Sequence, residues 1–220
     1  DAGIGEENML FEFTDNALDA IRDESSEPNK ILLKIIPNKN NTFLLAIADN
    51  GHGMYSIHKQ FLEGDKKKLS KIGRKNEGGL NSLLGLNPET VAIISRNLTC
   101  NSDDENYGKY SGIYLNTRSF MDKIKEVEHH NYSEAQYDED CNGGSFKNEK
   151  KEDIPNKWIV DDPEFTDYNT VLYLKFDIKD HSRISEILKS YVTRLPYSYK
   201  LPNMRYEKSD TRCYITPAIT

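Results

Sequence analysis

Three polar side chains share one face of the first helical segment of the chain. Glu12, Asn16 and Asp19 are separated by four and three residues, which places them on the same side of a helix. The stripe behind them is apolar and comprises Leu10, Phe13, Ala17, Ala20 and Ile21. A carboxylate and an amide one turn apart could serve as a general base and a metal ligand. A solvated helix face has the same pattern, so this segment alone leaves both interpretations open.

A second polar group follows two apolar runs that predict a β-hairpin. Turn-forming residues separate the runs ILLKIIP and TFLLAIA, and the sequence DNGHGM follows the second run. Asp49, at the end of this strand, can accept a hydrogen bond from the amino group of a nucleotide base. Gly51 and Gly53 would let backbone and base approach closely, and Met54 would pack on the ring. Clusters of Asp, Asn and Gly are also typical of plain turns.

A glycine- and lysine-rich segment covers residues 64–79 and leads into GLNSLLGL, which favours a helix. Backbone N–H groups at the N-terminus of such a helix can bind phosphate, and nearby basic side chains add positive charge. The candidate phosphate-binding residues are Lys71, Gly73, Arg74, Lys75, Gly78, Gly79, Leu80 and Asn81. A lysine run is also typical of a solvated surface, and a glycine pair can be a hinge without a ligand.

Later segments predict two further strands and a second helix. Residues 90–96 and 170–176 are apolar, β-leaning runs, and Thr170 begins the second of them. Residues 183–193 have apolar side chains at helical spacing. The chain therefore alternates helical and extended segments around one expected core.

The domain organisation follows from where the composition changes. Between about residues 101 and 167 the chain is rich in Asn, Asp, Glu, Lys and Tyr, which indicates a low-complexity, flexible insertion. Prolines punctuate the last segment, which favours extended backbone there. We therefore expect one domain over residues 1–194, and an extended tail or the beginning of a further module over residues 195–220.

Composition narrows the class of protein. The 220 residues carry a net charge of −7, which argues against a generally basic nucleic-acid surface. No apolar run approaches the roughly 20 residues of a membrane span, and the first residues are polar rather than a signal peptide. The three cysteines lack CxxC spacing, so neither a disulfide framework nor a structural zinc site is predicted. We expect an intracellular protein, nuclear or cytoplasmic, without a membrane partner.

The motifs occur in the order of a known superfamily. Glu12 and Asn16 form ExxxN, Asp49 begins DxGxG, a glycine loop leads into a helix, and Thr170 begins a late strand. In this order they resemble the Bergerat-fold ATPases of the GHKL superfamily. Its members include type II topoisomerases, the ninety-kilodalton heat-shock chaperone, histidine kinases, the MutL mismatch-repair protein and the microrchidia (MORC) ATPases. DNALDA and GGLNSLLGLNPETVAIISR look most like the MORC branch, whereas KIIPNKNNTFLLAIADNGHGM and GGSFKNE look like the chaperone.

The resemblance implies both a fold and a reaction. The implied fold is a two-layer α/β (α+β) sandwich, with a mixed, mostly antiparallel sheet and helices on one face. The implied reaction is slow, Mg²⁺-dependent ATP hydrolysis, with ATP and Mg²⁺ as the bound groups. In this scheme Glu12 is the general base, Asn16 is the Mg²⁺ ligand and Asp49 binds adenine.

The same resemblance completes the nucleotide site and suggests partners. Asp19, Ala20 and Thr170 would contact the nucleotide, and the loop over residues 73–82 would close on the phosphates. In this type of protein ATP binding commonly drives the closure of a homodimer. A MORC-like protein would also associate with DNA or chromatin, here through regions outside this chain.

The glycine loop departs from the superfamily pattern GxxGxG. Asn76 stands where the middle glycine is expected if Gly73 and Gly78 are the ends of the motif. Asn tolerates a left-handed backbone better than most residues. The altered loop favours a non-hydrolysing nucleotide-binding interaction module, whereas the presence of Glu12 favours a hydrolase. An ATPase that resembles the heat-shock chaperone is the second alternative.

Overall fold

The first strand pair is the hairpin that the sequence predicts. β1 covers Ile31–Pro37 and β2 covers Thr42–Asp49, and the two strands pair antiparallel along all of β1. Asn40 and Asn41 in the connecting turn have φ angles of 58° and 54°. A tight hairpin turn requires this left-handed backbone, and Asn is among the residues that tolerate it.

The computed structural model describes residues 7–21, 30–54, 57, 85–119, 144–154, 163–198, 204–209 and 212–217. Its helices are α1 (Glu7–Ile21) and α5 (His181–Ser198), with short 3₁₀ helices η3 (Lys151–Asp153), η5 (Pro163–Phe165) and η6 (Ile178–Asp180). The later strands are β3 (Thr90–Arg96), β4 (Tyr110–Asn116), β5 (Gly144–Glu149), β6 (Thr170–Asp177), β7 (Met204–Ser209) and β8 (Arg212–Pro217). None of the helices in these residues is long and apolar enough to cross a membrane.

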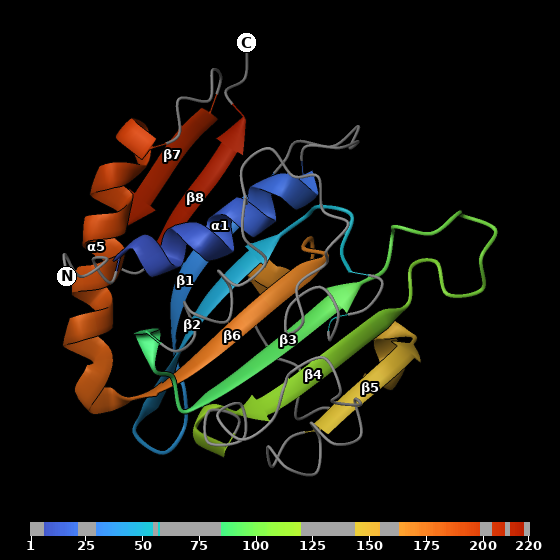
Figure 1. Cartoon of the computed structure of the whole chain (residues 1–220), viewed down its shortest axis with the longest axis horizontal. Helices are drawn as coiled ribbons and strands as arrows, with labels where there is room; N and C mark the ends of the chain where they lie inside the picture. The colour runs from blue at the N-terminus through green and yellow to red at the C-terminus, as the bar shows by residue number, and fades with distance from the viewer. Residues whose placement is uncertain are drawn as a thin grey trace, which may run out of the picture.

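The strands form one sheet of eight in the order β5-β4-β3-β6-β2-β1-β8-β7. Each neighbouring pair in that order is antiparallel, so the expected α+β class is confirmed, and the described strands contain no parallel pair. β6 comes late in the chain but lies between β2 and β3 (Figure 1). This order brings Thr170, at the beginning of β6, beside Asp49, at the end of β2, although the two residues are far apart in the sequence.

The segment after residue 194 joins the sheet. α5 continues to Ser198, and β8 pairs antiparallel with β1, so the β7–β8 hairpin extends the sheet past its first hairpin. Without β8, β1 would present unpaired N–H and C=O groups at the edge of the sheet, and β8 pairs with β1 from Ile31 to Lys34. The predicted insertion over residues 101–167 also contributes strands, because β4 and β5 pair with one another. Its residues 120–143 and 155–162 lie outside the described residues.

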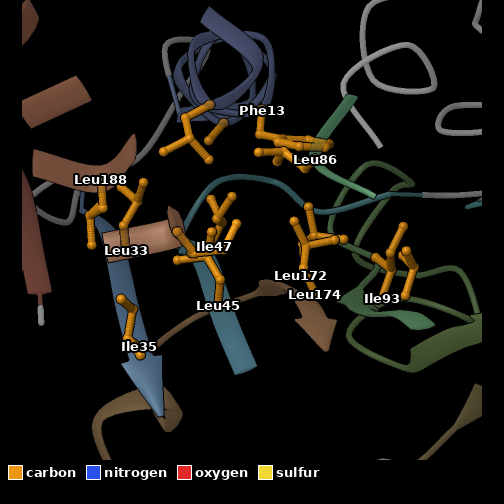
Figure 2. Packing of buried hydrophobic residues seen from close by; sticks show 14 of the residues in the cluster. Phe13, Leu33, Ile35, Leu45, Ile47, Leu86, Ile93, Leu172, Leu174 and Leu188 are labelled. Carbon is orange, nitrogen blue, oxygen red and sulfur yellow. The ribbon is translucent and has the colours of Figure 1, made fainter. Parts of the chain in front are cut away.

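α1 and α5 cover one face of the sheet and enclose the larger core. The apolar stripe predicted for α1 is buried at Leu10, Phe13 and Ala17. Figure 2 shows Phe13 next to Leu86 and above the sheet residues of this core, with Leu188 of α5 beside β1. Alternate residues of each strand point to this face, as the period of two for a strand requires.

A buried polar contact links the two helices within this core. The hydroxyl of Thr14 lies 2.6 Å from the hydroxyl of Tyr191, and both side chains are fully buried. Thr14 also donates to the carbonyl of Leu10 at 2.8 Å, so the hydroxyl of Tyr191 donates to Thr14. The bond fixes how α5 sits against α1, and α1 in turn lies across β1 and β2 (Figure 1).

The opposite face of the sheet holds a second, smaller cluster. Phe165, the last residue of η5, and Tyr168 pack with Val171 and Tyr173 of β6. An ion pair between Lys34 of β1 and Glu164 of η5 holds this segment against the sheet. The sheet is therefore covered by the two α-helices on one face and, in part, by a short irregular segment on the other.

Candidate functional site

Polar residues of three adjacent strands meet at one end of the sheet. The strand register makes Thr170, the first residue of β6, the cross-strand partner of Asp49 in β2 and of Ser95 in β3. All three side chains point to the face covered by helices, because they lie two residues beyond Ile47, Leu172 and Ile93 of the larger core. Asp49, Thr170 and Ser95 therefore form a polar row at the edge of an apolar core.

A pocket opens above this row, between the sheet and the C-terminal half of α1. Its volume of about 80 Å³ is several times the space that one water molecule needs. The described residues around it are Phe13, Asn16, Ala17, Ala20, Ile47, Asp49, His52, Gly53, Met54, Ile93, Thr170 and Leu172. The predicted site residues Asn16, Ala20, Asp49, Gly53, Met54 and Thr170, which are far apart in the sequence, thus line one cavity.

The turn after β2 is held by a dense set of hydrogen bonds. One carboxylate oxygen of Asp49 accepts from the backbone N–H of Gly51 at 2.9 Å. Asn169 donates its side-chain amide to the carbonyls of Gly51 and Asn50, at 2.8 and 3.1 Å. Its backbone N–H also donates to the carbonyl of Asp49 at 2.9 Å. Asn169, which the sequence did not single out, therefore fixes the turn on which Asp49 depends.

The two glycines of DxGxG are required by the packing of the protein itself. A Cβ atom at Gly51 would lie 2.6 Å from the carbonyl oxygen of Ala20, at the end of α1. Gly53 has a φ of +71°, and a Cβ atom there would lie 1.6 Å from the carbonyl oxygen of Arg96. The turn is thus pressed between α1 and the end of β3. Close approach was predicted for both glycines, but the neighbour is protein backbone, and Gly51 is not among the residues that line the pocket.

A hydrogen bond from this turn to α1 closes one side of the pocket. The backbone N–H of His52 donates to the carbonyl of Ala20 at 3.2 Å, which satisfies a carbonyl group in the last turn of the helix. Nδ1 of His52 lies 2.8 Å from the carbonyl oxygen of Gly53 and, because a carbonyl can only accept, Nδ1 carries a proton. His52 also lines the pocket, although it is not among the residues that the motifs singled out.

Ser95 lies behind the pocket and joins two of its walls. Its hydroxyl accepts from the backbone N–H of Met54 at 2.9 Å and lies 2.9 Å from the hydroxyl of Thr170. The side chain is fully buried. The sequence contains a signal for this residue, because alternation along β3 places Ser95 on the same face as Val91 and Ile93, where an apolar residue is expected.

The remaining predicted site residues, Glu12, Asn16 and Asp19, belong to α1. Asn16 lines the pocket, and Glu12 lies one helical turn before it on the same face, exposed and outside the pocket wall formed by the described residues. The pKa of Glu12 is raised, first by partial desolvation of its carboxyl group and second by the nearby carboxylate of Asp15. Asp19 belongs to α1, but its side chain lies outside the described residues.

The residues predicted to bind phosphate belong to the stretch between Ile57 and Gly85. Residues 58–84 lie outside the described residues, and this range contains Lys71, Gly73, Arg74, Lys75, Gly78, Gly79, Leu80 and Asn81. The described chain resumes at Gly85, where a Cβ atom would lie 2.0 Å from the terminal carbon of Met9. The segment that follows these residues is therefore packed directly against α1.

The chemistry of the pocket combines apolar walls with a polar end. Phe13, Ile47, Ile93 and Leu172 supply apolar surface, whereas Asp49 and Thr170 supply an acceptor and a hydroxyl side by side. Such a pocket suits a flat, largely apolar ring with a polar edge that can donate to a carboxylate. Comparisons of the chain with protein-family models and with curated proteins find no match.

Proposed function

We propose that the pocket binds the adenine ring of ATP, and that the chain is a slow, Mg²⁺-dependent ATPase of the Bergerat type. The observation that carries the proposal is the gathering of Asn16, Asp49, Gly53, Met54 and Thr170 around one cavity. These residues belong to three motifs that are far apart in the sequence, namely ExxxN, DxGxG with the methionine that follows it, and the beginning of a late strand. A set of unrelated turns and solvated faces would have no reason to converge on one pocket.

The arrangement of the walls supports one orientation of the nucleotide. The amino group of adenine would donate to Asp49 at the polar end, with the ring between the sheet and Met54. The phosphates would then extend along the polar face of α1, past Asn16 toward Glu12. Asn16 offers an amide oxygen that would hold Mg²⁺ together with phosphate oxygens, and the ion would neutralise charge on the phosphates. The antiparallel sheet with helices on one face is the coarse architecture that such a site requires.

The environment of Glu12 supports its role as the general base. A carboxylate with an ordinary pKa is a weak base near neutral pH, and a raised pKa moves it toward the range in which proton transfer is efficient. Desolvation and Asp15 both act in this direction. Glu12 would orient and deprotonate the water that attacks the terminal phosphate.

Calorimetric titration with a non-hydrolysable ATP analogue and with ADP, each with and without Mg²⁺, tests the binding proposal. We expect binding that Mg²⁺ strengthens, and we expect Asn16→Ala to remove most of the Mg²⁺ effect. Asn8→Ala is the matched control, because Asn8 lies on the same helix but contacts Arg194 rather than the pocket. The proposal fails if no nucleotide binds, or if both variants behave alike.

A non-hydrolysing nucleotide-binding module is the second candidate. The observation that favours it is the exposure of Glu12 outside the pocket wall, since an exposed base must be brought to the phosphates by other groups. Glu12→Gln separates the two candidates, with Glu186→Gln on α5 as the control. In a hydrolase, Glu12→Gln binds ATP like the wild type and loses turnover by about a hundredfold or more. In a non-hydrolysing module neither variant changes anything measurable.

We further propose that ATP drives the closure of a homodimer, as the MORC-like motifs imply, with DNA or chromatin contacted through regions outside this chain. A chaperone-like ATPase remains the alternative branch. Light scattering with the ATP analogue and with ADP tests closure directly. A doubled mass with the analogue alone supports it, and an unchanged mass under saturating analogue excludes nucleotide-driven association of this chain.

A further inference from the structure

We propose that Asn50 is a modification site: it deamidates spontaneously when the turn after β2 opens, a bound nucleotide slows the reaction by keeping the turn closed, and the product disables the pocket. The part that concerns the nucleotide rests on the proposed function. The chain contains two Asn–Gly pairs, Asn50–Gly51 and Asn142–Gly143. This dipeptide is especially prone to deamidation, because glycine has no side chain to hinder the attack of its backbone nitrogen.

The reaction joins the backbone nitrogen of Gly51 to the side-chain carbon of Asn50. As the bond from that nitrogen to Cγ forms, the bond from Cγ to Nδ2 breaks, and ammonia leaves with the proton of the Gly51 N–H. The product is a cyclic imide. Water then opens the imide at one of its carbonyl groups, which leaves aspartate or isoaspartate at position 50. Hydroxide accelerates the reaction, because the attacking nitrogen must first lose its proton.

The closed turn opposes the attack directly. The backbone N–H of Gly51 is held by the carboxylate of Asp49 at 2.9 Å. Removing its proton would place a negative nitrogen against that carboxylate, and like charges at this distance repel. The side-chain oxygen of Asn50 accepts from the backbone N–H of Lys30 at 2.6 Å, which ties the side chain to the residue before β1.

The backbone around Asn50 is held as well. Its N–H donates to the carbonyl of Lys30 at 3.3 Å, and the side chain of Asn169 donates to the carbonyls of Asn50 and Gly51. Asn50 has an exposed fraction of 8%, which limits the access of water and hydroxide. Ring closure requires the side chain of Asn50 to leave Lys30 and reach the nitrogen of Gly51. Deamidation therefore follows the fraction of time for which the turn is open.

Isoaspartate at this position does not fit the closed turn. It routes the main chain through the former side chain and so lengthens the backbone before Gly51 by a carbon atom. Gly51 cannot take up this length toward α1, because even a Cβ atom there would lie 2.6 Å from the carbonyl oxygen of Ala20. The bond from the N–H of His52 to that carbonyl would be displaced. Since Asp49 and His52 line the pocket, the modified chain should lose affinity for the nucleotide.

A nucleotide protects the turn by mass action. The carboxylate of Asp49 that holds Gly51 is also the proposed acceptor for the adenine amino group, and His52 and Gly53 of the same turn line the pocket. An open turn displaces these groups, so the nucleotide binds the closed form alone. The open fraction then falls by the factor 1 + [L]/Kd, which is about tenfold at a ligand concentration of about ten times Kd.

The second Asn–Gly pair is an internal control. Asn142 precedes β5 in the sequence, and β4 and β3 separate β5 from the strand that begins with Thr170. Its rate of deamidation should therefore not respond to the nucleotide.

The test follows both pairs by peptide mapping with mass spectrometry, which detects the replacement of an amide by an acid. The full chain is incubated in mildly alkaline buffer in three states: folded, folded with ADP and Mg²⁺, and unfolded in urea. In urea the two positions should react at similar rates. In the folded chain Asn50 should react at least about tenfold more slowly than in urea. ADP at about ten times its Kd should slow Asn50 by about another tenfold and leave Asn142 unchanged.

Asn169→Ala tests whether the turn controls the reaction. The variant loses the side-chain bonds to Asn50 and Gly51, so the turn should open about tenfold more often, and deamidation of Asn50 should accelerate by that factor. Asn101→Ala, which truncates an exposed asparagine, is the matched control and should change nothing. In the wild type, the binding capacity for ADP in calorimetric titration should fall in step with isoaspartate at position 50 and not with deamidation of Asn142.

The inference is overturned if Asn50 deamidates as fast in the folded chain as in urea, or if ADP binds but does not slow the reaction. In the second case the proposed function stands. If no nucleotide binds, the proposed function fails together with the protective effect, and the comparison with urea still decides whether the turn controls Asn50. That comparison needs no variant, so the inference stays testable even if Asn169→Ala does not fold.

Discussion

Two rows of side chains cross the same three strands on the same face of the sheet, and they are equally buried but chemically opposite. The middle row is apolar, with exposed fractions of 0 to 1% at Leu45, Leu174 and Val91. The row at the strand ends is polar, with exposed fractions of 0 to 6% at Asp49, Thr170 and Ser95. Position and burial are therefore matched, and the chemistry of the side chains is what differs.

The two rows differ in what their burial does for the stability of the fold. Apolar side chains at these depths stabilise the fold directly, and Figure 2 shows Leu45, Leu174 and their neighbours filling the core beneath α1. Buried polar groups cost free energy unless each finds a partner. The polar row has partners in the backbone N–H groups of Gly51 and Met54. These hydrogen bonds offset the cost of burying the polar side chains. Apolar residues at the same positions would stabilise the fold without needing such partners, so the polar side chains are consistent with the proposed role in binding.

Truncating a side chain of the middle, apolar row should have the largest effect on stability. Leu174→Ala removes a fully buried side chain at the centre of the sheet, and we expect the free energy of unfolding to fall by about 3–5 kcal/mol. Urea denaturation followed by circular dichroism measures this change. Lys175→Ala, the adjacent and partly exposed position, should change it by less than about 0.5 kcal/mol. At temperatures where it is folded, Leu174→Ala should bind the ATP analogue like the wild type. If the folded Leu174→Ala variant bound the ATP analogue more weakly than the wild type, the apolar row would also take part in binding, which contradicts the proposed difference between the two rows.

A substitution in the polar row should weaken the binding of ATP and leave the stability of the fold almost unchanged. Asp49→Asn keeps the size of the side chain and an oxygen for the N–H of Gly51, but it replaces the second acceptor by a donor. We expect the affinity for ATP to fall by about 100-fold, while stability changes by less than about 1 kcal/mol. Calorimetric titration and urea denaturation measure the two quantities.

Asp177→Asn is the matched control for this substitution. Asp177 ends the same strand that Thr170 begins, and it accepts from the backbone N–H of Lys179 at 2.9 Å, far from the pocket. The control should leave the affinity for ATP unchanged. Equal losses in the two variants would mean that Asp49 acts through general charge rather than as the acceptor for the base.

Local patterns were enough to predict the parts of the site that lie on single elements. Helical spacing predicted the buried and polar faces of α1, and the turn residues predicted the β1–β2 hairpin. The sequence DNGHGM indicated a close approach of backbone, which the contacts at Gly51 and Gly53 bear out with protein neighbours. These features depend on residues a few positions apart, so periodicity and turn chemistry report them.

Features that depend on distant pairing could not be predicted in this way. Thr170 becomes significant because β6 lies between β2 and β3, and nothing in its own segment indicates that position. Asn169 is significant because it reaches the carbonyl of Gly51, 118 residues away. The β7–β8 hairpin joins the sheet through β1, whose free edge no local pattern reveals. Each of these features depends on a contact between segments that are far apart in the sequence.

The smallest expected effect concerns the pH dependence of turnover, outside both rows. Asp15 is the second cause of the raised pKa of Glu12, so Asp15→Asn should lower that pKa while desolvation still holds it above the ordinary value. A general base works in its deprotonated form, so turnover falls as the pH drops through its pKa. In Asp15→Asn this fall should therefore begin at a lower pH than in the wild type. Solvent screens a partly exposed pair of charges, which makes the displacement modest.

The pH profile of kcat for the wild type and for Asp15→Asn measures this displacement, with the remote and exposed Asp103→Asn as control. Raising the ionic strength should move the wild-type profile in the same direction as Asp15→Asn, because salt screens the same repulsion. A profile that moves with neither the substitution nor salt would mean that another group titrates in turnover. The nucleotide would then still be bound by the polar row, but Glu12 would no longer be its base.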